Sequence, residues 1–293
     1  MIENLKPSLS KRLLSVVIDL VLFLILMFIF SNFVINPIIQ NTTDYQNQYQ
    51  IYEDKLVSSG LAVKDENNTL QIAFYNYNTN EVDNYDKILV EFYTNFDASK
   101  ATENLTKYQN SKKDYGDLFI YDEQTNIYTF NKENLDNSQT FFISSFNDAL
   151  NYLLNNDNEY ANSYKAISFY MNLSKYLSVF VAALIPFMII PLFLKGKSVG
   201  KLVMKLEVKK ISNELEDVKL SNICLRSLAL IIIEVVGSYL IYGIPALISL
   251  FMIMGNKNGM SLHDYIAKTC VIDKTIPQEK TENVIEVEAS IKD

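Results

Sequence analysis

Three long apolar stretches dominate the pattern of hydrophobic and polar positions along this chain. Residues 13–35 include one charged side chain, Asp19, residues 176–194 include none, and residues 227–254 include one, Glu234. A helix needs about 20 predominantly apolar residues to cross a bilayer, and a lone span must satisfy its backbone hydrogen bonds internally. The pattern therefore predicts an α-helical polytopic membrane protein with three apolar segments.

The third stretch is long for one crossing and is interrupted by glycines and Pro245. It either crosses once, leaving the C-terminus outside, or bends near Gly243 and returns, leaving it inside. Residues 244–254 would make only about 16 Å of helix, too short to cross alone, but a re-entrant segment is permitted where protein buries it. Lys257 and Lys268 follow directly and favour an inside end. We therefore expect the third segment to be kinked or re-entrant.

A polar region with its own periodicities separates the first two stretches. Helical spacing of apolar residues, alternating β-rich runs and the segments between them predict a small α+β domain on two helical stalks. The expected elements are a helix through Tyr45 and Leu56, a strand over 70–77, a helix over 82–96, a weaker helix over 98–113, a hairpin of 118–121 with 127–130, and a helix from Phe142 towards the second span.

Charge divides the chain in the same way. Residues 36–172 carry 9 Lys, no Arg and 20 acidic side chains, a net charge of −11 within a total of −8, so the remainder has a net charge of +3. Lysines precede the first span and crowd the segment after the second, and such short basic flanks stay cytoplasmic. We expect a multi-pass protein of the plasma membrane with the N-terminus and C-terminus inside and residues 36–172 outside.

A cleaved signal peptide is the alternative for the first span. An apolar run of this length is too long for one, and no small-residue cleavage site follows it. The expected organisation is a cytoplasmic N-terminus 1–12, a transmembrane helix 13–35, an extracytoplasmic α+β insertion 36–172, a second transmembrane helix 173–195, a cytoplasmic loop 196–226, a third transmembrane or re-entrant segment 227–254, a closing motif 255–274 and a disordered tail 275–293.

Composition excludes several functions for the outer region. Residues 36–172 contain neither His nor Cys, so catalytic triads, soft-metal sites and disulfides are not expected there. The net charge argues against nucleic-acid binding. We expect no enzyme activity, no cofactor and no metal. The Tyr and Asn content suits either a surface for an extracytoplasmic protein partner or, preferably, a Tyr-rich helical core.

A few charged groups lie inside or beside the apolar segments. Arg12 and Asp19 are seven residues apart and share one helix face, and the partner of Asp19 is Arg12, another helix or water. Glu234 follows Arg226 by eight residues. The chain contains only these two Arg, each before a carboxylate, where a guanidinium can hold a carboxylate or a lipid phosphate or serve as a topological anchor.

Four separate pieces of this chain resemble the RDD family of membrane proteins, which is named for one Arg and two Asp. These pieces are RLLSVVID, GKSVGKLVMKLEV, Arg226 and SLHDYIAKTCVID. The resemblance covers roughly residues 8–35 and 174–273 and leaves 36–172 as an insertion. The residues that carry it are Arg12, Asp19 and Asp264, the loop residues Gly196, Ser198, Gly200, Lys201, Leu206 and Val208, and the closing residues Leu262, His263, Asp264, Ala267, Thr269 and Val271.

The residues of these pieces predict local structure and roles as well. The runs 206–208 and 270–272 are short and β-like and can pair on one side of the membrane, which requires the bent third segment. The loop is not a phosphate-binding loop, because the G-x-x-x-x-G-K spacing fails. His263, the only histidine, takes part with Asp264 either in proton transfer or, preferably, in capping a helix or anchoring a loop.

Two functions follow. The first is a transport component in which charged residues form a proton or cation path, namely Arg12, Asp19, Arg226, Glu234, His263 and Asp264. The resemblance supports it, since cation/proton antiport is ascribed to at least one member of the family. With so few spans, it would work as a homo-oligomer or with another membrane protein. The second is an accessory or receptor-like membrane protein whose outer domain binds a protein or cell-surface partner.

Overall fold

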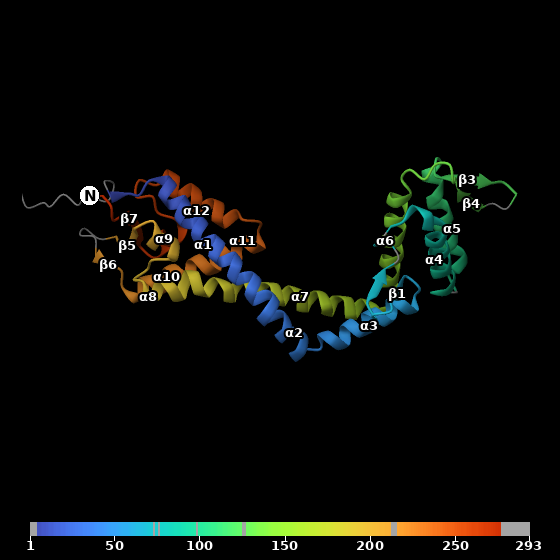
Figure 1. Cartoon of the computed structure of the whole chain (residues 1–293), viewed down its shortest axis with the longest axis horizontal. Helices are drawn as coiled ribbons and strands as arrows, with labels where there is room; N and C mark the ends of the chain where they lie inside the picture. The colour runs from blue at the N-terminus through green and yellow to red at the C-terminus, as the bar shows by residue number, and fades with distance from the viewer. Residues whose placement is uncertain are drawn as a thin grey trace, which may run out of the picture. The chain divides into compact units, whose positions relative to one another are not determined.

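The computed structural model describes residues 5–72, 74–75, 77–97, 99–124, 127–211 and 216–276. The chain forms two compact units (Figure 1): unit 1 is Met1–Ile38 with Asn172–Asp293, and unit 2 is Ile39–Met171. Unit 1 therefore joins the two ends of the sequence, and unit 2 is the stretch between them. The predicted tail beyond Ile276 lies outside the described residues.

Helix α1, Leu9–Phe30, buries a mainly polar face and exposes most of its large apolar side chains. Its buried residues are Arg12, Ser15, Asp19 and Phe23, which recur every three or four positions and so form one face. The other faces carry large apolar side chains, which are exposed. A helix that hides charge and exposes hydrocarbon is suited to a lipid environment, where ionisable groups face protein or water.

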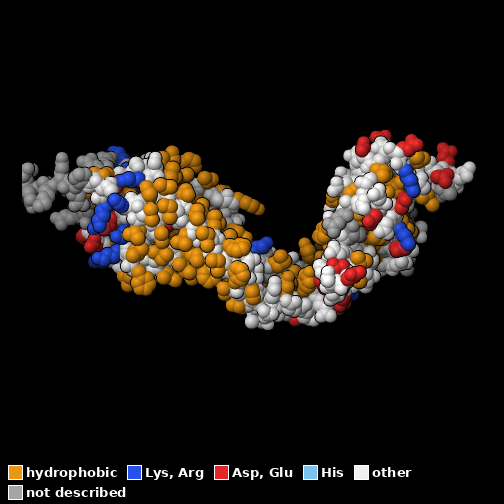
Figure 2. Space-filling view, viewed as in Figure 1, with side chains coloured by type: hydrophobic (Ala, Val, Ile, Leu, Met, Phe, Trp, Pro, Cys, Tyr) orange, Lys and Arg blue, Asp and Glu red, His pale blue; other side chains and the backbone are white. Residues whose placement is uncertain are grey.

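Three helices are long and apolar enough to cross a membrane. They span Leu9–Thr42, Asn158–Phe193 and Leu220–Leu240, and a shorter apolar helix covers Ile244–Gly255. Hydrophobic side chains cover most of the visible face of unit 1, and Lys and Arg gather at the end that carries the sheet (Figure 2). The long helices are composed of α1, η2 (Ser31–Ile35) and α2 (Asn36–Thr42), of α7 (Asn158–Leu184), η5 (Ile185–Ile189) and α8 (Ile190–Phe193), and of α10 (Leu220–Ala229), η6 (Leu230–Val236) and α11 (Gly237–Leu240).

Each long helix contains a π-helical segment, η2, η5 or η6. The first helix continues past Pro37 because η2 directly precedes it and adjusts the backbone at the point where proline cannot donate a hydrogen bond. The third π-helical segment, η6, contains Glu234. Wider turns of this kind often lie at functional sites.

The third apolar segment bends. After α11 the backbone enters the left-handed region at Tyr242 and Gly243, and α12, Ile244–Gly255, begins with Pro245 in its first turn. A Cβ built on Gly237 would lie 3.5 Å from the ring of Pro245, so α12 returns along the helix that precedes it. This confirms the predicted bend of the segment.

A small antiparallel sheet joins distant parts of unit 1. Its strand order is β6-β5-β7, with β5 at Leu206–Lys210, β6 at Glu216–Asp217 and β7 at Thr269–Asp273. Val208 pairs with Val271 and Leu206 with Asp273, which confirms the predicted pairing of 206–208 with 270–272. The loop after the second long helix and the end of the closing motif therefore lie at one end of the unit. Short helices α9, Val199–Val203, and α13, Leu262–Ile266, flank these strands in sequence.

Unit 2 has its own hydrophobic core, in which many of the buried side chains are Phe and Tyr. Phe92, Phe141, Phe142 and Phe146 are almost completely buried. Its elements are α3 (Tyr45–Ser58), β1 (Ala62–Lys64), β2 (Leu70–Ile72), η3 (Thr79–Glu81), α4 (Val82–Asn95), α5 (Ala101–Lys112), η4 (Lys113–Tyr115), β3 (Phe119–Asp122), β4 (Ile127–Phe130) and α6 (Ser138–Asn156). The hairpins pair β1 with β2 and β3 with β4.

Two predicted elements of this unit were wrong in extent. The strand expected over 70–77 ends at Ile72, because the chain turns and the ring of Phe74 packs against Phe146. The helix expected from Phe142 towards the second span ends at Asn156, and a separate helix, α7, begins at Asn158. Asp157 interrupts the expected helix with an extended backbone, and its carboxylate accepts hydrogen bonds from the first amides of α7, as an N-cap does.

Candidate functional site

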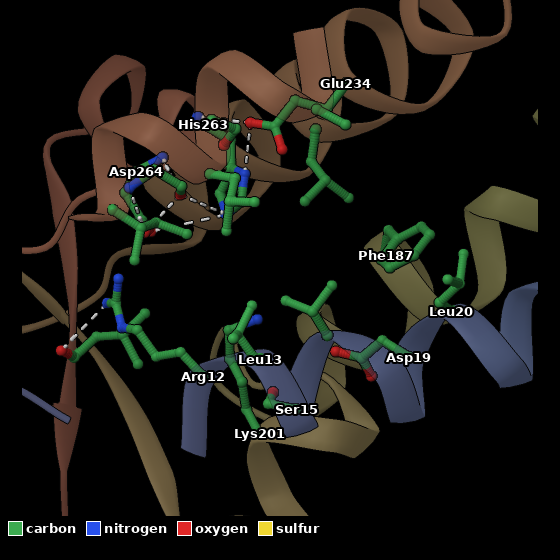
Figure 3. A pocket seen from close by; sticks show the side chains of 18 of the residues that line it. Arg12, Leu13, Ser15, Asp19, Leu20, Phe187, Lys201, Glu234, His263 and Asp264 are labelled. Atoms are coloured by element: carbon green, nitrogen blue, oxygen red, sulfur yellow. Dashed lines mark hydrogen bonds and ion pairs between the residues drawn. The ribbon is translucent and has the colours of Figure 1, made fainter. Parts of the chain in front are cut away.

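A cavity of about 360 Å³ lies inside unit 1 and collects most of the predicted site residues. Helix α1 forms one wall with Arg12, Ser15 and Asp19, and the opposite wall carries Glu234, His263 and Asp264 (Figure 3). Its volume is in the range of small-molecule sites in proteins. The apolar lining residues are Leu9, Leu13, Val16, Leu20, Phe23, Phe187, Leu206, Leu230, Val235, Ala246, Leu250, Ile253 and Val271.

Asp19 is held by the loop after the second long helix. Its Oδ2 accepts a hydrogen bond of 2.5 Å from the hydroxyl of Ser198, and its Oδ1 accepts one of 2.7 Å from the amide of Gly200. Of the three predicted partners, another helix is therefore the one observed, since Ser198 caps α9 and Gly200 belongs to it. No ion pair joins Asp19 to Arg12 among the described residues. The carboxylate occupies the N-terminal end of α9, where free amides favour a negative charge.

The remaining loop-motif residues have defined positions as well. Gly196 has a positive φ of 85°, and its carbonyl accepts a hydrogen bond of 3.1 Å from Arg226. The ammonium of Lys201 lies 3.2 Å from the hydroxyl of Ser198. Burial and then the positive charge of Arg226 lower the pKa of Lys201 to about 8. Lys201 can therefore lose its proton close to physiological pH.

Arg226 and Asp264 form a buried ion pair across two segments. Nε and Nη2 of Arg226 lie 2.9 and 2.8 Å from Oδ1 of Asp264. Asp264 also accepts a hydrogen bond of 2.6 Å from the Ser261 hydroxyl and completes a capping box at the start of α13. Burial opposes ionisation of Asp264, but Arg226 and further nearby cations outweigh it and hold the pKa of this carboxyl below its usual range. The predicted cap is thus present.

His263 connects this ion pair to Glu234. Its Nδ1 lies 2.8 Å and its backbone amide 3.0 Å from Oε1 of Glu234. Its Nε2 lies 3.2 Å from Nη2 of Arg226. The same Nε2 also lies 3.0 Å from the hydroxyl of Ser261. The His263 ring therefore contacts Glu234 on one side and Arg226 and Ser261 on the other.

Arg12 is buried without a carboxylate partner among the described residues. Its guanidinium donates to the carbonyl of Gly259 and lies 3.5 Å from the carbonyl of Val271. The first long helix is thereby fixed to the closing motif, and Lys11 adds an ion pair of 2.5 Å with Asp273. Neither Arg pairs with the carboxylate of its own helix; each reaches a different segment.

The arrangement can bind a small polar group or pass protons. It places titratable side chains from α1, α9, η6 and α13 around one cavity. A second cavity of about 20 Å³ is lined in part by Lys201, Arg226 and His263, which is enough room for one water molecule. No cluster of His, Cys, Asp and Glu suited to a metal ion occurs in the described part of the chain.

Sequence reasoning missed the serines of this site. Ser15 and Ser249 are buried and line the cavity, and Ser261 caps α13. Ser261 was detectable, because Ser followed three residues later by an acidic residue is the capping-box pattern. No sequence signal distinguishes Ser15 or Ser249, because serine is common in apolar helices and its partner depends on the fold.

Cys270 gives a direct check on the packing of β7. Its side chain is fully buried, and burial, followed by the charge of Asp264, raises its pKa to about 11. The thiol therefore stays protonated at neutral pH, and only the thiolate reacts with maleimide. We expect no labelling of Cys270 in the folded protein at pH 7.5 and complete labelling in SDS, measured by mass spectrometry. The half-buried Cys224 serves as the comparison; equal labelling of both before SDS would contradict this packing.

The comparisons with known proteins agree with the membrane character of unit 1. A model of the RDD family matches residues 139–268, so the chain contains an RDD family domain. The match begins inside unit 2, 35 residues before the predicted resemblance resumes at 174, and does not include α1. Searches of curated proteins and of solved structures gave no match.

Proposed function

We propose that this protein is a component of a transport system in the plasma membrane, in which unit 1 couples solute movement to protons or cations. The observation that carries the proposal is the His263–Glu234 pair on the wall of the cavity, joined through Arg226 to Asp264. Groups that exchange protons inside an apolar bundle are costly and usually serve function. Lys201, whose pKa is lowered to about 8, supplies a second group that titrates under physiological conditions.

Vesicles test the coupling. With purified protein in liposomes, an imposed Na⁺ gradient should drive proton movement that a pH-sensitive dye records. Glu234→Gln should lower this flux about tenfold, because the amide cannot take up a proton from His263. Glu216→Gln is the matched control, since Glu216 is an exposed partner of Lys210 away from the cavity. Absence of flux in the wild type would overturn ion coupling.

The proposal includes an orientation with both termini in the cytoplasm and residues 36–172 outside. It is supported by the lysines near the sheet and by the Lys11–Asp273 ion pair, which holds the N-terminal segment beside β7. In a chain whose own cysteines are replaced by serine, Asn283→Cys should resist an impermeant maleimide in intact cells and Asn67→Cys should react. Labelling of Asn283→Cys from outside would contradict the orientation.

A second candidate function is supported by the separate core of unit 2. In this alternative, unit 1 anchors an accessory or receptor-like protein, and unit 2 binds a protein or cell-surface partner. Deleting residues 41–162 distinguishes transport by unit 1 from partner binding by unit 2. Flux that survives the deletion assigns transport to unit 1, whereas loss of cellular activity with normal flux in vesicles assigns the biological role to unit 2.

A further inference from the structure

Some of the polar groups around the cavity of unit 1 have hydrogen-bond partners within the protein, and others have none among the described residues. The three carboxylates on its walls already accept hydrogen bonds from the protein: Asp19 from Ser198 and Gly200, Asp264 from Arg226 and Ser261, and Glu234 from His263. A cation entering the cavity would therefore compete with these internal donors. The acidic side chains do not by themselves define a cation site here.

The groups without partners lie on α1. Nε of Arg12 and Oγ of Ser15 make no hydrogen bond within the described part of the chain, although both residues are more than nine-tenths buried. Both residues line the cavity. Buried polar groups in native proteins are nearly always hydrogen-bonded, and a buried guanidinium without a carboxylate is costly. These two groups therefore point to a ligand that accepts hydrogen bonds and carries a negative charge.

Lys201 adds a third hydrogen-bond donor to the lining of the cavity. Its ammonium has three N–H donors and one described hydrogen-bond partner, Ser198. Burial and the charge of Arg226 lower its pKa, and the nearby carboxylates of Asp19 and Asp264 partly offset this effect. The remaining N–H donors of Lys201 can therefore serve an acceptor in the cavity.

The rest of the cavity is hydrocarbon. Lining residues recur along α1 from Leu9 to Phe23, which is about 21 Å of helix. Beyond Asp19 this wall continues with Leu20 and Phe23, and α12 contributes Ala246, Leu250 and Ile253 at helical spacing. Ala246 on α12 and several lining residues of α1, among them Val16 and Leu20, are exposed, so the cavity opens between these two helices. The lining thus combines a polar end with a long apolar wall.

We propose that this cavity binds a single-chain aliphatic carboxylate, with its head group at Arg12, Ser15 and Lys201 and its tail along Leu20, Phe23 and Leu250. One negative charge matches the few uncommitted donors better than a phosphate monoester, which carries more charge and more acceptor oxygens to satisfy. The inference rests on the proposed transport function in that it names the solute; the binding site itself is tested without transport.

Photoaffinity labelling with the full-length protein tests the site. The probe is dodecanoate carrying a diazirine near the end of its tail, added to protein in phosphatidylcholine nanodiscs. We expect adducts at the less exposed lining residues Phe23 and Leu250, located by fragmentation of the labelled peptides, and competition by unlabelled dodecanoate. Adducts spread over the exposed apolar face of α1, for example at Val17 and Phe28, would indicate partitioning into lipid and overturn the proposal.

Competitors of the same chain length identify the head group. Dodecanoate should displace the probe at concentrations at least tenfold lower than dodecanol, dodecylammonium or dodecyl phosphate. Equal competition by dodecanol would show that charge is not recognised, and tighter binding of dodecylammonium would show a cation site. Tighter binding of dodecyl phosphate would replace the carboxylate by a phosphate ester. Each of these three outcomes overturns the proposal.

Variants place the ligand within the cavity. Ser15→Ala should weaken dodecanoate binding about fivefold, as loss of one hydrogen bond does, and Lys201→Gln at least tenfold. Ser10→Ala and Lys205→Gln are the matched controls, because both side chains are exposed and neither lines the cavity. Ala246→Trp should abolish site-specific labelling by filling the part of the cavity beside α12, whereas Leu247→Trp, on the neighbouring exposed position, should not. Unchanged labelling in Ala246→Trp would overturn the proposed position.

These tests separate the two proposals. If dodecanoate binds but vesicles show no proton-coupled Na⁺ flux, the ligand site stands and the transport function fails. If flux is present but dodecanoate does not compete for the site, the transport function stands and the solute class is wrong.

Discussion

Asp264→Asn should destabilise unit 1 by about 3–5 kcal/mol, the usual cost of leaving one member of a buried ion pair uncompensated. Arg226 and Asp264 expose 6% and 1% of their surface, so solvent cannot replace the lost charge. The guanidinium would remain buried against the carbonyl of Gly196 and the ring of His263. The measurement is the unfolding free energy, or the midpoint, of purified protein titrated with SDS.

The double variant Arg226→Met/Asp264→Leu provides the decisive comparison. It removes both charges, so much of the loss should be recovered. Recovery should be incomplete by about 1 kcal/mol, because Asp264 also caps α13. Glu216→Gln, which breaks an exposed pair, should cost less than about 1 kcal/mol. An effect of Asp264→Asn no larger than this control would show that the ion pair does not hold the fold together.

The same pair gives a pH dependence with a defined sign. The pKa of Asp264 is lower in the folded protein than its ordinary value of 3.8. Its contribution to stability is therefore fully present above that ordinary value and is lost as pH falls through the lower, folded value. The difference in unfolding free energy between the wild type and Asp264→Asn should stay constant from pH 5 to pH 8. It should become smaller only in stronger acid.

The sequence predicts where the helices and strands of this protein lie better than it predicts their exact ends or the contacts between them. Apolar length locates the long helices because crossing a bilayer requires it, and the bend at Gly243 follows from residues that favour it. The end of α6 at Asp157 was missed because the apolar spacing continues while a single capping side chain separates two helices. Boundaries of this kind depend on one local contact rather than on a pattern.

In the candidate site, the charged residues were predictable from the sequence, but their contacts were not. The charged residues of the cavity are visible in the sequence because ionisable groups are rare in apolar segments. Their pairing is not, since Arg12 and Asp19 share a helix face and still bind different segments. Side chains that contact residues far along the chain are placed by the packing of α9, α13 and β7, for which spacing within one helix gives no information. The serines are missed for the same reason.

Gly200→Ala should be almost as damaging as the loss of Asp264, although it adds only one methyl group. A Cβ at this position would lie 2.0 Å from the carbonyl oxygen and 2.8 Å from the carbonyl carbon of Ser15. These atoms belong to the backbone of α1 and cannot rotate away as a side chain would. Helix α9 would have to move from α1, and the hydrogen bonds from Gly200 and Ser198 to Asp19 would break.

We expect a loss of at least about 3 kcal/mol, because overpacking alone costs about 1–3 kcal/mol and each hydrogen bond to a charged group contributes about 1.5–3 kcal/mol. Gly255→Ala is the matched control in the same unit, since a Cβ there meets no atom within 4 Å. It should be neutral or stabilise by up to about 1 kcal/mol through the unfolded chain. The same SDS titration measures both variants. If Gly200→Ala behaves like Gly255→Ala, α9 does not pack against α1 at this distance, and the binding of Asp19 by the loop is wrong as well, because both depend on the same approach.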